Sequence, residues 1–149
     1  MINASFVFGL DGDTKDTFKA TLDWIVKNRI ETVTSHILTP YPGTALYNRL
    51  RGEERIITDD LSLYNTAHVV FKPKNMTEQE LADGYLWIYR QIYSFKNILR
   101  RMPRAKNQRP AYLMFNIFYR KFGKFTDFLC KCIPYKRIGI MGEKISRYL

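Results

Sequence analysis

Apolar and polar residues alternate along two short stretches in the first half of the chain, which is the pattern of β-strands with one buried face. The first stretch runs over residues 2–10 and the second over residues 30–38. One face of these strands is apolar and consists of Ile2, Ala4, Phe6, Phe8, Leu10, Val33 and Ile37. The opposite face is mostly polar and consists of Asn3, Ser5, Val7, Gly9, Thr32, Thr34 and His36.

A helix is predicted after each strand. Apolar residues recur at helical spacing over residues 18–25, behind a turn whose Asp13 or Thr14 can cap the helix. Thr44 can cap a shorter helix that ends near Gly52. Two consecutive strand–loop–helix units place both loops at the same end of a parallel sheet, where α/β folds bind ligands. The sequence therefore predicts an α/β fold, and in a parallel barrel the polar strand face would line the interior.

Helices dominate the second half of the chain. Thr77 and Glu80 form a capping box at the start of a helix that is predicted to end before Pro103. Its core-facing stripe consists of Leu81, Tyr85, Ile88, Ile92, Phe95, Leu99 and Met102. Another helix is predicted from Pro110, with an apolar face made of Phe115, Phe118, Phe122, Phe125, Leu129 and Cys132. Between the two halves, residues 53–66 have the pattern of a loop and residues 67–72 predict a short strand.

The charge is unevenly distributed along the chain, which has a net charge of +10. Residues 1–75 hold 9 Lys and Arg against 9 Asp and Glu, whereas residues 76–149 hold 15 against 5. A basic second half indicates an anionic partner or simply a solvated helical surface. An anionic membrane is favoured over a nucleic acid, because the aromatic residues share one apolar stripe and do not alternate with the basic residues as stacking platforms.

The spacing of the two cysteines and the absence of an apparent signal peptide predict a protein of a reducing compartment. Cys130 and Cys132 are separated by one residue, which suits neither a C-x-x-C redox pair nor a zinc knuckle. We therefore expect no metal site, and a cytoplasmic protein with reduced cysteines. No signal peptide is apparent, and no apolar stretch approaches the roughly 20 residues that span a bilayer.

The turn after the first strand carries the first candidate chemistry. Its glycines precede a helix, but Asp11 and Asp13 would repel a phosphate, so the acidic turn better suits ribose hydroxyls or an ammonium group. The plain alternative is that Asp13 only caps the helix. His36 faces the predicted cavity, where a lone histidine is more often a packed or hydrogen-bonded residue than a ligand.

Two segments, FVFGLDGDTKDTF and HILTPYPGTALY, together resemble the late strands of a radical SAM barrel, and most closely those of cobalamin-dependent (class B) members. The segment that follows, YNTAHVVFKPKNMTEQELADGYLWIYRQIYS, resembles the uncharacterised helical domain of the branch that includes the hopanoid methylases. The resemblance covers about residues 2–105. It implies two domains, a C-terminal portion of the barrel over residues 1–58 and a basic helical domain over residues 59–149.

The resemblance also implies a chemistry, in which a [4Fe–4S] cluster cleaves S-adenosylmethionine reductively to a 5′-deoxyadenosyl radical. Such radicals support methyl transfer or related reactions at unactivated carbons, with cobalamin as a further cofactor. Carried over to this chain, the residues that line the adenosine pocket or approach the substrate are Val7, Gly9, Asp13, His36, Thr39, Pro40 and Tyr41.

The chain departs from this family in three respects. It has no C-x-x-x-C-x-x-C motif, whose three thiolates hold the cluster, and neither the first four barrel strands nor a cobalamin-binding domain is present. We therefore expect a fragment with no catalytic residues of its own, inactive without its missing N-terminal half and unable to bind cluster or cobalamin alone. The alternative is a non-catalytic basic helical module that binds a partner protein or the inner face of a membrane peripherally.

Overall fold

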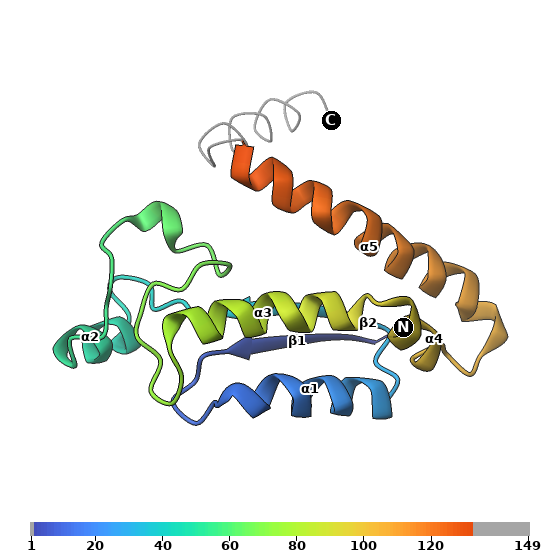
Figure 1. Cartoon of the computed structure of the whole chain (residues 1–149), viewed down its shortest axis with the longest axis horizontal. Helices are drawn as coiled ribbons and strands as arrows, with labels where there is room; N and C mark the ends of the chain where they lie inside the picture. Colours follow the sequence, from blue (N-terminus) through green and yellow to red (C-terminus); the bar gives the residue numbers. More distant parts are fainter. Residues whose placement is uncertain (1, 133–149) are drawn as a thin grey trace.

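The computed structural model describes the backbone of residues 2–132 and the side chains of residues 2–120. A small parallel sheet lies among helices, which confirms the predicted mixed α/β class (Figure 1). The strands are β1 (Asn3–Phe8) and β2 (Thr32–Ile37). The helices are α1 (Lys15–Lys27), α2 (Ala45–Gly52), α3 (Glu78–Ile92), α4 (Phe95–Arg100) and α5 (Arg109–Cys132), with short 3-10 helices η1 (Leu61–Leu63) and η2 (Lys106–Gln108). Within this part of the chain, no helix is long and apolar enough to cross a membrane.

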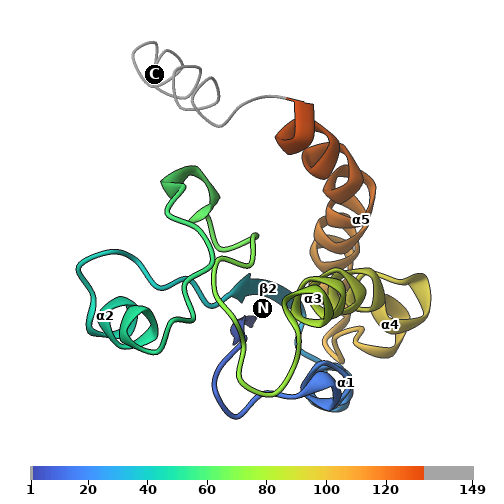
Figure 2. The same ribbon diagram turned by 60° about the vertical axis from the view of Figure 1, so that its left-hand side comes forward.

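The two strands pair in parallel, with α1 as the connection between them. Their register runs from Asn3 opposite Thr32 to Phe8 opposite Ile37. The apolar face predicted from the alternation is the covered one, because Phe8 packs against Phe18 of α1 with ring centroids 4.8 Å apart. Helices α1 and α3 lie on the same side of the strands (Figure 2).

Helix α3 is attached to β2 by hydrogen bonds as well as by apolar packing. The hydroxyl of Tyr93 donates to the carbonyl of Val33 at 2.7 Å, and the hydroxyl of Tyr89 bonds to the backbone of Ser35. On its other flank α3 crosses α1 closely at Gly84, where a Cβ atom would lie 2.1 Å from the Phe18 ring. The resulting core draws on both halves of the chain: Phe8, Phe18, Leu22, Ile25, Ile30, Val33, Ile37, Leu50, Phe71, Met76, Leu81, Ile88, Ile92 and Tyr93.

The capping box at Thr77 and Glu80 is confirmed, but the predicted continuous helix from there to Pro103 is wrong. The chain leaves the helix at Tyr93, and Ser94 caps a separate helix, α4, by accepting a hydrogen bond from the Asn97 N–H. The break rotates the apolar stripe, so that Phe95 and Leu99 are exposed while Asn97 and Ile98 are buried. Asn97 is held there by its hydrogen bond to the carbonyl of Gln91.

The prediction of a strand over residues 67–72 is also wrong. The chain instead makes an isolated antiparallel bridge between Ile56 and Phe71, flanked by backbone hydrogen bonds of Ile57 and Lys72. This short pairing closes a loop around a second small core, which consists of Tyr47, Tyr64 and Val70.

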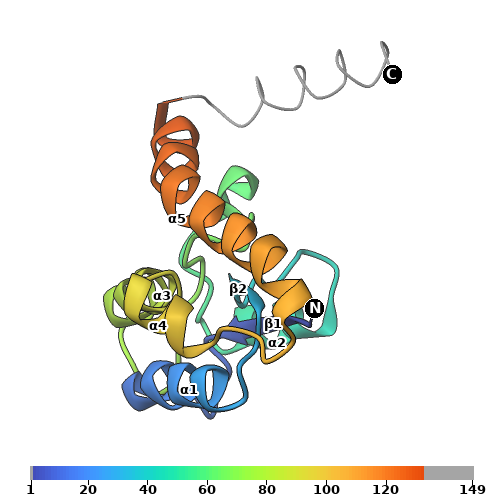
Figure 3. The ribbon, with the colours of Figure 1, turned by 90° about the vertical axis from the view of Figure 1, so that its right-hand side faces the viewer.

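Helix α5 begins beside Pro110 as predicted, but the two members of its predicted apolar face that the structure describes do not point into the core. The buried side carries Tyr112 and Asn116, while Phe115 and Phe118 are exposed. The remaining members of that face, Phe122, Phe125, Leu129 and Cys132, lie outside the described side chains. Figure 3 shows α5 crossing the body near its own N-terminal end and then extending away from it.

A buried arginine explains why α5 presents its Asn116 side. The Arg101 guanidinium is fully buried and donates to the carbonyls of Ile30 and Ile92, both at 2.7 Å, and to the side-chain oxygen of Asn116 at 3.1 Å. Asn116 in turn donates to the carbonyl of Glu31. Burial lowers the pKa of Arg101, and these acceptors replace the water that the cation loses.

Candidate functional site

The first part of the candidate site is the polar face of the two-stranded sheet. Parallel pairing sets Asn3 beside Thr32, Ser5 beside Thr34 and Val7 beside His36, all on the side away from α1 and α3. The side chains of β1 on this face are exposed, and those of β2 are half-buried. The face therefore ends, at the carboxyl end of the strands, in one apolar and one imidazole side chain next to each other.

The turn after β1 is shaped by Asp13. Its carboxylate oxygen Oδ2 accepts hydrogen bonds from the N–H groups of Gly9 at 2.8 Å and Leu10 at 2.9 Å. Of the two predicted caps, Thr14 is confirmed as the N-cap and exchanges hydrogen bonds with Thr17, so the interpretation of Asp13 as the helix cap is wrong. Asp13 instead fixes the backbone at the point where β1 ends.

Gly9 occupies a position that no other residue could fill without strain. Its φ is +100°, a conformation that side chains with a Cβ rarely adopt. A Cβ atom there would also lie 3.0 Å from Leu81 and 3.1 Å from Phe71. The backbone at the end of β1 is therefore buried and closely packed against Leu81 and Phe71.

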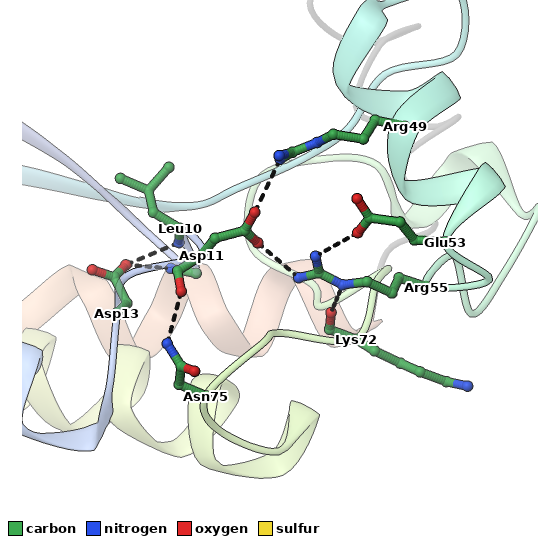
Figure 4. A network of polar contacts seen from close by, with 9 residues as sticks. Leu10, Asp11, Asp13, Arg49, Glu53, Arg55, Lys72 and Asn75 are labelled. Carbon is green, nitrogen blue, oxygen red and sulfur yellow. Dashed lines mark hydrogen bonds and ion pairs between the residues drawn. The ribbon is translucent and has the colours of Figure 1, made fainter.

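The second acidic residue of the turn is engaged by two arginines of the same chain, as Figure 4 shows. The Asp11 carboxylate lies 3.2 Å from the Arg49 guanidinium and 3.0 Å from that of Arg55. The contact with Arg55, supported by the charge of Arg49, holds the pKa of Asp11 below its usual range. The Asn75 side chain donates to the Asp11 carbonyl at 2.7 Å, so the network joins the β1 turn to three later segments.

The turn after β2 is rigid and partly exposed. The Thr39 hydroxyl donates to the carbonyl of Ile37, Pro40 is buried, and Tyr41 is exposed. The turn from Tyr41 to Thr44 places Gly43 at a φ of +86°, as the second central position of a type II turn after Pro42 requires. Thr44 then caps α2 by accepting a hydrogen bond from the Tyr47 N–H.

Thr66 is the residue at this site that the sequence did not indicate. Its hydroxyl lies 3.1 Å from Nδ1 of His36, and its carbonyl accepts a hydrogen bond from the Ile37 N–H at 2.7 Å. Its φ is +65°, which is rare for a β-branched residue and costs on the order of 1–3 kcal/mol. Strained positions of this kind occur preferentially at functional sites, and this one positions the imidazole ring.

The seven predicted site residues therefore fall into two groups. Val7 and His36 are neighbours on the open sheet face, with Gly9 close behind Val7. Asp13, Thr39, Pro40 and Tyr41 lie in the two turns that follow the strands. Two hollows, of about 380 and 360 Å³, lie elsewhere and include none of the seven.

An iron–sulfur cluster does not fit the residues of this chain. A [4Fe–4S] cluster with an open iron needs three thiolates, and the sequence holds two cysteines one residue apart. Among the residues that the structure describes, no group of three or more His, Cys, Asp or Glu could hold a metal ion.

Comparison with known proteins places these elements in a family context. A family model described as a domain of unknown function, DUF4070, matches residues 44–112, from the cap of α2 to the first turn of α5. The chain is 35% identical over 101 residues to the bacteriochlorophyllide d C-12(1)-methyltransferase of Chlorobaculum tepidum, an alignment that covers 68% of the chain and 22% of that enzyme. The chain thus spans about a fifth of the length of this relative.

Two further relatives agree with this match. The anaerobic magnesium-protoporphyrin IX monomethyl ester cyclase of Cereibacter sphaeroides is 32% identical over 111 residues, which cover 74% of the chain and 18% of that enzyme. The bacteriochlorophyllide d C-8(2)-methyltransferase of Chlorobaculum tepidum is 31% identical over 100 residues, which cover 67% of the chain and 22% of that enzyme.

Proposed function

Because the chain belongs to the cobalamin-binding radical SAM family and corresponds to the C-terminal part of its members, we propose that it forms the adenosine- and substrate-side wall of such an active site. In this proposal β1 and β2 are late strands of a partial (β/α) barrel. Two of the relatives above are methyltransferases and one is a cyclase by name, so we propose methyl transfer or a related radical reaction for the complete enzyme.

One observation carries the proposal: side chains on the polar face of the sheet are exposed on β1 and half-buried on β2, while both packed helices lie on the other face. In a barrel of parallel strands the helices lie outside and the opposite strand face points inward, with the ligand at the carboxyl ends of the strands. The open face, with Val7 and His36 at this end, has the orientation that an interior wall requires.

Each residue has a distinct role in this wall. Val7 packs against the adenine ring, and Gly9 allows the backbone to approach it closely. His36, oriented by Thr66, offers its second ring nitrogen to a ribose hydroxyl or to the substrate. Thr39, Pro40 and Tyr41 form the rim, and Asp13 acts through the backbone of Gly9 and Leu10 without touching the ligand.

The thiolates that hold the cluster belong, in this proposal, to another part of the enzyme or to a partner polypeptide with a C-x-x-x-C-x-x-C motif. The same holds for cobalamin. When bound, the cluster supplies the electron that cleaves S-adenosylmethionine. The residues of this chain would bind and orient the adenosine group, and we expect no such cleavage by the chain alone.

The proposal can be tested on the chain as it stands. Titration of the isotopically labelled chain with S-adenosylmethionine should shift the amide signals of Val7, Gly9, His36, Thr39 and Tyr41. We expect weak, millimolar affinity, because a single wall buries only part of the ligand. Val7→Asp should abolish the shifts, since it places a charge against the adenine.

Ile57→Asp is the matched control, because Ile57 is 42% exposed against 45% for Val7 and lines the larger hollow instead. This variant should keep the shifts. The proposal fails if millimolar ligand shifts only residues around that hollow, if it shifts none, or if both variants behave alike.

A further inference from the structure

The outer face of α5 is an exposed apolar surface. Tyr112 and Asn116 are fully buried and define the inner side of the helix. Successive residues of a helix turn by about 100°, so residues two positions after each of these lie on the opposite side. This outer face, which is exposed to solvent throughout, consists of Met114, Phe115, Ile117 and Phe118.

The position of α5 makes its outer face accessible. Among the described side chains, contacts with the rest of the molecule lie along the inner side of the helix, where Tyr112 donates to the carbonyl of Ile98, Asn116 to that of Glu31 and Arg120 to that of Tyr93. In Figures 1, 2 and 3 the C-terminal end of α5 stands clear of the other elements. Contiguous apolar side chains on an exposed helix mark an interaction site more often than scattered ones do.

The charge around this face has a single sign. Residues 84–126 contain no Asp or Glu and ten Lys or Arg. Of these ten, Arg101 is buried, and five others on α4, η2, α5 and the segment between α4 and η2 are exposed to solvent: Lys96, Arg100, Arg104, Lys106 and Arg120. A surface of this kind is complementary to an anionic partner and repels a basic one.

We propose that the outer face of α5 docks this chain on an anionic lipid bilayer, with the helix lying in the interface. Apolar and aromatic side chains on one side, with basic residues beside them and no acidic ones, are what an interfacial helix needs, because its apolar side enters the headgroup region while cations meet lipid phosphates. A single convex helix face fits a fluid surface that can mould around it, and it offers no groove for a peptide or a nucleic acid base.

Vesicle flotation with the full chain tests the proposal. Wild type should float with vesicles that contain phosphatidylglycerol and stay in solution with pure phosphatidylcholine vesicles. Raising the salt from about 0.1 M to about 1 M shortens the Debye length from about 10 Å to about 3 Å, so binding should fall by about tenfold or more.

A matched pair of variants separates the apolar contribution from the charge. Met114→Asp and Leu61→Asp each add one negative charge at a side chain that is 64% exposed, but Leu61 lies on η1, away from α5. Met114→Asp should lower vesicle binding by about tenfold, and Leu61→Asp should lower it little. Met114→Trp should strengthen it, because Trp favours the interface.

Three results would overturn the proposal. One is wild type that does not float with anionic vesicles at low salt. Another is an equal loss of binding in Met114→Asp and Leu61→Asp. The third is a dimer that Met114→Asp dissociates while vesicles bind nothing, which would assign the face to a second copy of the chain. None of these results bears on adenosine binding at the sheet.

Discussion

At the scale of single residues, Gly84 decides how closely α1 and α3 can approach. Glycine is a poor helix former, and its place in the middle of α3 has no local explanation. The explanation is across the interface, where the Phe18 ring fills the space that a side chain would need.

Gly84→Ala should therefore destabilise the fold, although alanine is the better helix former by about 1 kcal/mol. A Cβ atom 2.1 Å from Phe18 must displace the ring or the helix, and overpacking of this kind costs about 1–3 kcal/mol. After the gain in helix propensity is subtracted, we expect a net loss of up to about 2 kcal/mol in the free energy of unfolding, measured by urea denaturation.

Gly52→Ala is the control for this substitution, because nothing lies within 4 Å of a Cβ at Gly52, which ends α2. It should leave stability unchanged within about 0.5 kcal/mol. Equal effects of the two substitutions would show that the contact between Gly84 and Phe18 has no energetic weight.

The site illustrates what local patterns can and cannot predict at this scale. The alternation of the strands correctly assigned Val7 and His36 to one face, because side-chain direction in a strand is set by the neighbouring residues alone. The contact of Thr66 with His36 and the role of Asp13 in the turn were missed. Both depend on backbone conformations, a positive φ and a backward hydrogen bond, that have no periodic signature.

At the scale of elements, the starts of helices were predicted better than their ends and their buried faces. Thr44 and Thr77 cap their helices through contacts within three residues, so the local sequence is sufficient. The break at Ser94 was not predictable from periodicity, because the apolar stripe continues through it. The buried side of α5 was not predictable either. It is determined by the hydrogen bond from Arg101 to Asn116, and local periodicity contains no sign of this contact.

The network at Asp11 holds the β1 turn against α2 and the segment around Arg55. Asp11→Asn should lower the free energy of unfolding at neutral pH by about 1 kcal/mol, a modest value because the carboxylate is one-third exposed and solvent screens its ion pairs. Denaturant titrations of both proteins across pH measure this difference.

The sign of the pH dependence follows from the lowered pKa of Asp11. The stability that it contributes is present above the unfolded pKa of about 3.9 and is lost as the pH falls through the folded value. The gap between wild type and Asp11→Asn should therefore close below about pH 4. Asp23→Asn, which removes only an exposed pair with Lys19, should cost about 0.3 kcal/mol; a larger effect there than at Asp11 would contradict the prediction.

At the scale of the whole molecule, the mixed α/β class was predicted from the sequence, and the packing of its two halves was not. The contacts that join them, such as Tyr93 with Val33, link residues sixty positions apart. No pattern within a window of ten or twenty residues contains such a contact. The predicted boundary between residues 58 and 59 stays a prediction.

Buried tyrosines make the assembled molecule sensitive to alkaline pH. Burial raises the pKa of Tyr93, Tyr112 and Tyr64, so their neutral forms are favoured in the folded state. The stability that they contribute is complete below the unfolded pKa of about 10 and is lost as the pH rises towards the folded values. The melting temperature should hold to about pH 9 and then fall steeply.

Tyr93→Phe should cost about 1 kcal/mol at neutral pH, through the lost hydrogen bond to Val33, and should show a shallower alkaline fall than wild type. Tyr41→Phe, at an exposed position, should match wild type in both respects. Identical alkaline slopes for wild type and Tyr93→Phe would assign the fall to other groups.

The buried arginine sets an unusual rule for how this sequence can vary. Arg101 is held by the main-chain carbonyls of residues 30, 31 and 92, and every amino acid supplies a carbonyl there. These three positions can therefore change side chain without loosening this contact. Position 101 cannot change in this way. Even lysine, which keeps the charge, lacks the planar guanidinium that donates to several acceptors at once. This contact between the start of β2, the end of α3 and α5 thus depends on two side chains, Arg101 and Asn116, and on backbone carbonyls that any sequence provides.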